Sequence, residues 1–182
     1  MIASTRPVRA GEAVGRWFEH EARRHGGFEV EVVDLARLAL PLLDEPHHPR
    51  LARYQHEHTR RWSEIVSRAD AFAFVHPEYN HSFTAPLKNA IDFLHHEWAY
   101  KPVGLVSYGG VAGGTRAVQA LKPVLVVLRM APASTGVIIP FVSERIEEGG
   151  FRASEELEQA AAQMLDELCE LERALRGLRR AR

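Results

Sequence analysis

The stretch "HPEYNHSFTAPLKNAIDFLHHEW", residues 76–98, gathers side chains that enzymes use for proton transfer and for binding polar substrates. It holds a carboxylate, a phenol, an amide, imidazoles and a lysine around two prolines. One interpretation is that these side chains perform acid–base chemistry. The other is that the stretch holds a cofactor that carries the chemistry itself.

A second polar segment, "STRPVRAGE", covers residues 4–12 and precedes a predicted helix. Hydroxyl groups, guanidinium groups and free main-chain amides at the start of a helix suit a phosphate group. Because serine and threonine also cap helices without any ligand, a solvated and capped helix start is the alternative.

A third segment, "SYGGVAGGTR", covers residues 107–116 and contains four glycines. Glycines let the main chain approach a flat ligand closely, although glycine loops also occur simply as turns. The spacing matches neither the phosphate-binding loop of nucleotide hydrolases nor the dinucleotide-binding fingerprint.

Extended and helical patterns alternate along the chain, which predicts an α/β fold with a parallel, doubly wound sheet and one domain over residues 1–182. In such a sheet, ligands bind outside the carboxyl ends of the strands. We therefore expect the three polar segments to meet at one edge. Strands are predicted at residues 28–35, 70–77, 101–108 and 134–141, and helices at 9–25, 50–68, 84–98, 115–130 and 154–180.

The last predicted helix carries apolar residues at alternating steps of four and three, which form a heptad seam. Docking along the sheet is the simpler interpretation, and contact with a partner chain is the alternative. The seam contains Leu157, Ala161, Met164, Leu168, Leu171, Leu175 and Leu178.

Composition excludes several classes of protein. The net charge of −1 gives no basic surface for nucleic acid, and no apolar run is long enough to span a membrane. The single cysteine, Cys169, and a start without the apolar core of a signal peptide predict a cytoplasmic protein. The histidines do not follow a zinc-ligand spacing such as HExxH, so we expect no metal site.

Together, the segments "ASTRPVRAGEAVGRWF", "PEYNHSFTAPLKNAIDFL" and "SYGGVAGGTRAVQAL" resemble the NADPH-dependent FMN reductase family, which includes azoreductase-, chromate reductase- and quinone reductase-like flavoproteins. The resemblance implies a flavodoxin-like fold, non-covalent FMN, NADPH or NADH as reductant, and a homodimer or dimer of dimers. It also implies a small-molecule electron acceptor and no catalytic side chain, because hydride passes through the bound flavin.

The resemblance also assigns site residues by position. Ser4, Arg6 and Arg9 would hold the FMN phosphate. Pro77, Glu78, Tyr79 and Asn80 would line the isoalloxazine ring, and Ser107, Gly109 and Gly110 would meet its pyrimidine side.

The chain departs from the family pattern at several positions. Ala3 replaces a glycine, His81 stands where a small residue is common, and Pro123 interrupts a helix. The first strand is short, because only Met1, Ile2 and Ala3 precede the Ser-Thr-Arg loop. We expect that Met1 lies inside a longer natural reading frame; the alternative is that the fold accepts a first strand of three residues.

The function that the resemblance implies is an FMN-dependent NAD(P)H oxidoreductase that passes hydride from the nicotinamide to FMN and on to a quinone, an azo compound or free flavin. A flavodoxin-type electron carrier and a non-catalytic binding protein are the alternatives. We also expect a homodimer, because the apolar face of helix 84–98 is wider than one contact with the sheet requires. That face contains Leu87, Ile91 and Leu94, with Phe93 and Trp98 beside it.

Overall fold

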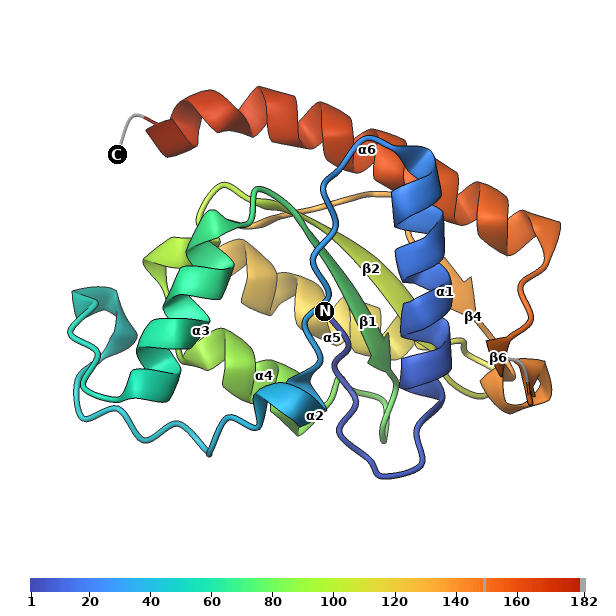
Figure 1. The fold of residues 1–182 in the computed structure, drawn as a ribbon, viewed down its shortest axis with the longest axis horizontal. Helices are drawn as coiled ribbons and strands as arrows, with labels where there is room; N and C mark the ends of the chain where they lie inside the picture. The colour runs from blue at the N-terminus through green and yellow to red at the C-terminus, as the bar shows by residue number, and fades with distance from the viewer. Residues whose placement is uncertain (149, 181–182) are drawn as a thin grey trace.

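Two buried parallel strands, β1 (Phe72–Pro77) and β2 (Pro102–Tyr108), form the centre of the sheet in this computed structural model, which describes residues 1–148 and 150–180. β2 is buried along its whole length, as expected for a strand covered on both faces. On its far side, β2 pairs in parallel with β3 (Ala131–Pro132) and β4 (Val137–Ile139). The predicted doubly wound α/β fold is confirmed (Figure 1).

Residues 1–3 take the place of a first strand between β1 and the segment that leads into α2 (Leu35–Leu38). The Ile2 N–H donates to Val33 O at 2.8 Å, and the Val75 N–H donates to Met1 O at 2.9 Å. The Met1 ammonium donates to Ala73 O at 2.6 Å. Burial lowers the pKa of this amine to about 5, against the opposing effect of the Asp34 charge.

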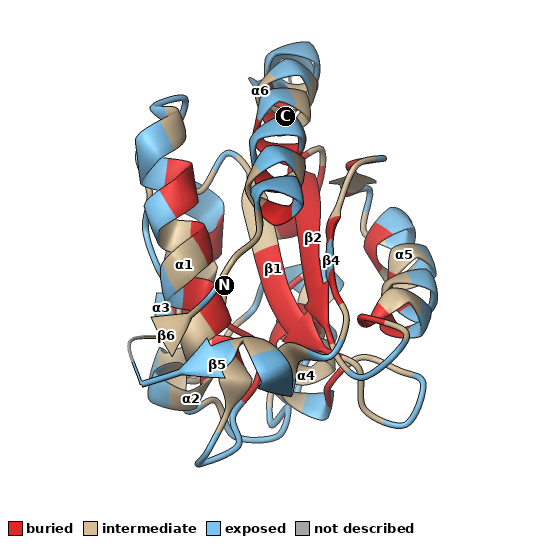
Figure 2. Cartoon of the chain, turned by 90° about the vertical axis from the view of Figure 1, so that its right-hand side faces the viewer, coloured by how far each residue is buried: buried red, intermediate tan, exposed pale blue. Residues whose placement is uncertain are grey.

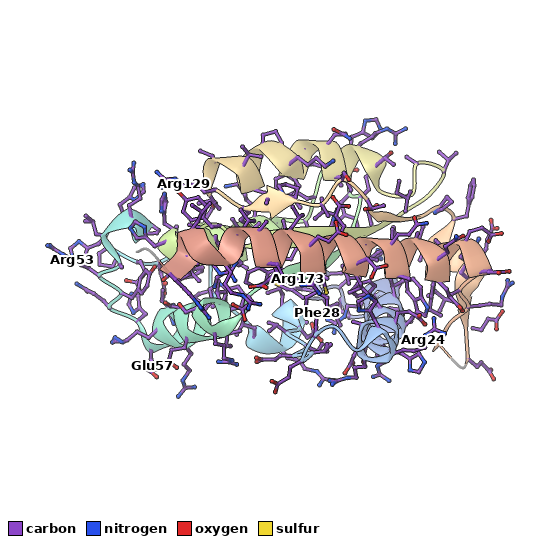
Figure 3. The ribbon with its side chains drawn as sticks, turned by 90° about the horizontal axis from the view of Figure 1, so that it is seen from above. Arg24, Phe28, Arg53, Glu57, Arg129 and Arg173 are labelled. Carbon is purple, nitrogen blue, oxygen red and sulfur yellow. The ribbon has the colours of Figure 1, made fainter. Side chains whose placement is uncertain are left out.

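The predicted strand at residues 28–35 is wrong. Within this segment only Asp34 forms a bridge, to Ile2. The alternating pattern did not yield a strand because the main chain beside it, residues 1–3, reaches only its last residues. Phe28 instead lines a cavity of about 680 Å³ together with Cys169 and Arg173 of the C-terminal helix (Figure 3).

Helices cover both faces of the sheet (Figure 2). α1 (Ala10–His25) and α6 (Glu155–Arg180) pack on one face, where Val75 and Val106 belong to their cluster. α3 (Glu57–Arg68), α4 (Ala85–Asp92) and α5 (Thr115–Val127) cover the other face. Short elements complete the described chain: η1 (Pro49–Leu51), η2 (His96–Trp98), η3 (Val142–Arg145), β5 (Ile146–Glu147) and β6 (Gly150–Phe151).

The heptad seam of α6 docks along the sheet, as the simpler interpretation predicted. Leu157, Ala161, Met164 and Leu168 are buried, whereas Leu178 near the end of the helix is half exposed. Close contact with β2 depends on Gly104, because a Cβ at this position would lie 2.7 Å from the sulfur of Met164.

The helix predicted at residues 50–68 starts later than expected, at Glu57, and Leu51 is 54% exposed instead of packing in the core. A tertiary contact keeps the preceding residues extended, because the Glu45 carboxylate accepts the main-chain N–H groups of Gln55 and His56 at 2.8 and 3.0 Å. The helix predicted at residues 84–98 ends at Asp92, and η2 follows it.

No helix within residues 1–148 and 150–180 combines the length and the apolar composition that a membrane span requires.

His76 is a fully buried polar residue of β1. Its Nδ1 lies 3.4 Å from Pro77 O, and its Nε2 has no hydrogen-bond partner among the described residues. Burial lowers the pKa of His76 to about 4, and the Pro77 carbonyl opposes this shift only in part. The imidazole is therefore neutral in the folded protein, whereas in the unfolded chain it takes up a proton near pH 6.5.

This difference predicts an acid-sensitive fold. The contribution of His76 to stability is complete above about pH 6.5 and declines as pH falls toward 4, by about 3 kcal/mol in total. His76→Phe removes this titration, so we expect its free energy of unfolding to fall less than that of wild type between pH 7 and pH 4. Urea unfolding at both pH values measures the difference. Equal losses in the two proteins would contradict the prediction.

Candidate functional site

Three loops follow residues 1–3, β1 and β2, which run parallel beside one another, and the loops therefore lie at one edge of the sheet, the lower edge in Figure 1. Ile2 pairs with Val75, and Pro77 pairs with Tyr108. This register places the segment after Ala3 beside the loop after β1, and both beside the glycine loop after β2. The predicted meeting of the three polar segments is confirmed.

The first loop leads into the N-terminus of α1. The N-cap residue of this helix, Arg9, makes no side-chain cap, whereas α2 and α4 are capped by the side chains of Asp34 and Thr84. Ser4 is buried, and its Oγ lies 3.1 Å from the Tyr79 hydroxyl. The exposed guanidinium of Arg6 lies 6.0 Å from the centre of the Tyr79 ring. Free helix amides, a hydroxyl and a guanidinium are the donors that an anion requires.

Arg9 is not free to bind a ligand in this structure. Its guanidinium forms an ion pair with Asp34, and the two side chains are only 10% and 9% exposed. Because Asp34 also lies beside Ile2 in the sheet, this pair ties the first loop to the strand edge. Arg6 is therefore the arginine of this loop that remains available to an anion.

Tyr108 is a site residue that the sequence analysis missed. Its side chain runs beneath the first turn of α1, and its hydroxyl has no hydrogen-bond partner among the described residues. Burial raises the pKa of Tyr108. A Cβ at Gly11 would lie 2.4 Å from this hydroxyl and 3.3 Å from the Cβ of Ser4, so glycine is needed there. The signal in the sequence that could have identified Tyr108 as a site residue is its place at the end of an apolar strand, directly before the glycine loop.

Glu78 joins the second loop to the third. Its carboxylate accepts the main-chain N–H groups of Arg116 at 3.0 Å and Ala117 at 3.4 Å, and the Arg116 guanidinium at 2.8 Å. Burial alone would raise the pKa of Glu78, but these hydrogen bonds lower it below its ordinary value. Because the N-cap of α5, Gly114, has no side chain, Glu78 serves as the cap of this helix.

The second loop is a tight turn. The N–H of Tyr79 donates to Ser82 O at 2.9 Å, and the N–H of Ser82 donates to Tyr79 O at 3.0 Å. Asn80 and His81 between them have φ values of 50° and 66°, which are typical of a type I′ turn. Both side chains are exposed, and the Asn80 N–H has no hydrogen-bond acceptor in the described part of the chain.

Ser107 and Pro77 are both buried at the ends of their strands, beneath the loops. Ser107 is fully buried, and its Oγ donates to Gly113 O at 2.9 Å. Gly109 is held from the other side, because its N–H donates to Ile139 O at 3.2 Å. Gly110 remains exposed. The glycine loop is thus fixed in shape while its outer surface stays open.

The site therefore offers anion donors on the first loop and exposed main chain on the two loops beside it. The donors are Ser4, Arg6 and the amides of α1, and the loop main chain is that of Tyr79, Asn80, Gly109 and Gly110. In the described part of the chain, no three His, Cys, Asp or Glu side chains are grouped closely enough to hold a metal ion.

The family model for NADPH-dependent FMN reductases matches residues 1–144. The chain belongs to this family. It is 38% identical to an NAD(P)H-dependent FMN reductase of Schizosaccharomyces pombe over 151 residues, which cover 82% of this chain and 75% of the relative. It is 35% identical to an NAD(P)H:quinone oxidoreductase of Solanum tuberosum over 111 residues, which cover 56% and 52%.

The fold of this FMN reductase family member also matches a solved structure, that of the flavoenzyme NAD(P)H:(acceptor) oxidoreductase FerB of Paracoccus denitrificans. The TM-score is 0.74 at 20% identity, and the match covers 94% of each chain. The expected flavodoxin-like fold, oxidoreductase class and FMN and NAD(P)H cofactors are confirmed. The residues described above fit FMN, because its phosphate needs anion donors and its ring can lie against exposed loop main chain.

The role of Glu78 as a cap predicts a loss of stability when it is removed. We expect Glu78→Ala to lower the free energy of unfolding by about 1–2 kcal/mol, the scale of a lost N-cap. We also expect faster amide hydrogen exchange in residues 109–117. Glu147→Ala is the control, because Glu147 forms an exposed pair with Arg152 whose loss costs little. Equal stability and equal exchange in the two variants would show that Glu78 does not hold the loop.

Proposed function

We propose that this protein binds FMN at the carboxyl edge of the sheet and uses it to pass electrons from NAD(P)H to a small acceptor such as a quinone, an azo compound or free flavin. The observation that carries the proposal is the uncapped N-terminus of α1, which lies beside Ser4, Arg6 and the ring of Tyr79. The phosphate subsite and the ring subsite are thus adjacent, and the contact between the Ser4 and Tyr79 side chains joins them.

The phosphate is held by Arg6, by Ser4 and by the free amides of α1. Tyr79, Asn80 and the glycine loop would support the ring. FMN supplies hydride and electron transfer when it is bound. The protein supplies position, because near-attack geometry between two bound rings accounts for a large part of such a rate.

The side chains around the ring subsite are already engaged. The Tyr79 hydroxyl bonds to Ser4, and Glu78 bonds to Arg116 and to the start of α5. Neither group is free to act as a general base. This supports the interpretation that residues 76–98 hold a cofactor, and that no side chain takes part in hydride transfer.

A quinone is the acceptor class that we favour, because the Solanum tuberosum relative is named as a quinone oxidoreductase. The alternative of a flavodoxin-type electron carrier has less support, since such carriers dock through strongly acidic surfaces and the net charge here is −1. Catalytic oxidation of NADPH by the FMN-loaded protein separates an enzyme from a carrier. A cytoplasmic location is part of the proposal and rests on the single Cys169.

We also propose a homodimer, but not through the apolar face of α4. The expectation that this face exceeds the needs of one chain was wrong, because Leu87, Ile91, Phe93, Leu94 and Trp98 are each at most 1% exposed within a single protomer.

The exposed apolar side chains of α5 offer a different contact for the second copy. Val126 and Val127 are 60% and 74% exposed. Sedimentation velocity of wild type and of Val127→Glu tests this contact. We expect a dimer for wild type and a monomer for the variant, whereas a wild-type monomer at micromolar concentration would contradict the proposal.

The two arginines of the first loop provide a matched pair for testing the phosphate subsite. Arg6→Ala should weaken FMN binding by roughly 1.5–3 kcal/mol, the scale of a charge-assisted hydrogen bond, with stability nearly unchanged. Arg9→Ala should mainly lower stability, because it leaves Asp34 buried without its partner. Fluorescence titration with FMN and with riboflavin, together with urea unfolding, measures both effects. If wild type bound FMN and riboflavin with equal affinity, the assignment of Arg6 to the FMN phosphate would be wrong.

A further inference from the structure

His81 is held in a conformation that favours glycine. It has φ of 66° in the turn between Tyr79 and Ser82, where its neighbour Asn80 also has positive φ. A residue with a Cβ carries a steric cost in this region that glycine avoids. Because two main-chain hydrogen bonds close the turn, its shape does not depend on the side chain of His81.

The His81 side chain makes no contact that offsets this cost. Its imidazole is exposed and forms no hydrogen bond, ion pair or ring contact with any described residue. Other histidines in the chain do have partners: His58 bonds to Asp44, and His96 bonds to Arg50 O. His81 thus has a strained main chain, lies in a loop of the binding site, and makes no contact that stabilises the fold. This combination points to a function of the side chain.

The other titratable groups on the three loops are less suited to donate a proton. Glu78 is bound to Arg116, the Tyr79 hydroxyl is bonded to Ser4, and the Tyr108 hydroxyl is buried. Arg6 is a guanidinium, which keeps its proton. His76, beneath the loop, is buried with its pKa lowered to about 4. His81 is thus the solvent-open imidazole at this edge of the described structure.

We propose that His81 donates a proton to the electron acceptor when that acceptor is reduced. This inference rests on the proposed function. Reduction of a quinone to a hydroquinone requires a hydride equivalent and one proton. NAD(P)H, through the bound cofactor, supplies the hydride equivalent. The N–H of the His81 imidazolium supplies the proton to a quinone oxygen, and the neutral imidazole then regains a proton from water.

Two acceptors separate this role from a structural one. A soluble benzoquinone takes up two electrons with protons, whereas ferricyanide takes up one electron and no proton. With NADPH as reductant, we expect His81→Gly and His81→Asn to lower benzoquinone turnover at least tenfold, since general acid catalysis contributes about a hundredfold or more. Turnover of ferricyanide and affinity for FMN should stay within twofold of wild type. Added imidazole should restore benzoquinone turnover in His81→Gly.

A measurement without turnover tests the strain itself. We expect His81→Gly to raise the melting temperature of the FMN-free protein by a few degrees, because glycine fits the turn. Equal benzoquinone turnover in wild type and both variants would overturn the role of His81. An equal loss with both acceptors would also overturn it, because that outcome indicates a disturbed cofactor site. Wild type that binds FMN and reduces neither acceptor would instead contradict the proposed function.

Discussion

The main-chain pairing of β1 on both of its edges is the interaction on which the site depends. One edge pairs with β2 over six residues in register, and the other exchanges hydrogen bonds with residues 1–3. All these segments run parallel, so three loops leave the sheet at the same edge. A slip of one residue would move Val75 away from the face that packs against α1 and α6, and would move the Tyr79 turn away from Ser4. Correct register is therefore a condition for any ligand site here.

Cross-links between the loops then fix what the sheet brings together. Ser4 bonds to Tyr79 across the first two loops, Glu78 bonds to Arg116 across the second and third, and Ser107 holds the glycine loop from inside. Each such bond contributes about 1 kcal/mol to stability. Their larger effect is geometric, because they hold the donors in place before a ligand arrives, so binding requires little further ordering.

The strands β1 and β2, the helix α6 and the shared edge could be predicted, because long apolar runs and heptads report burial directly. The absence of a strand at residues 28–33 could not be predicted, because an alternating apolar pattern does not show whether a neighbouring main chain is there to pair with it. The pairs Arg9–Asp34 and Glu78–Arg116 join positions 25 and 38 apart in sequence. The resemblance, which assigns residues by position, could not show these pairs and placed Arg9 and Glu78 against the ligand. Likewise, the apolar face of α4 looked the same whether its own core or a partner would cover it.

The chemical groups of residues 76–98 are mostly used to build the site. His76 lies in the core, Glu78 caps α5, Thr84 caps α4, and Lys88 pairs with Asp92 on the same helix. Such uses suit a protein whose cofactor supplies the redox chemistry, because the cofactor needs fixed donors and a flat surface more than it needs a nucleophile. Electron transfer through a flavin leaves one requirement that a fixed scaffold does not meet, which is the proton that accompanies two-electron reduction. A side chain for that step must be open to solvent and free of structural partners. Within residues 76–98, the loop after β1 presents such a group, the imidazole of His81.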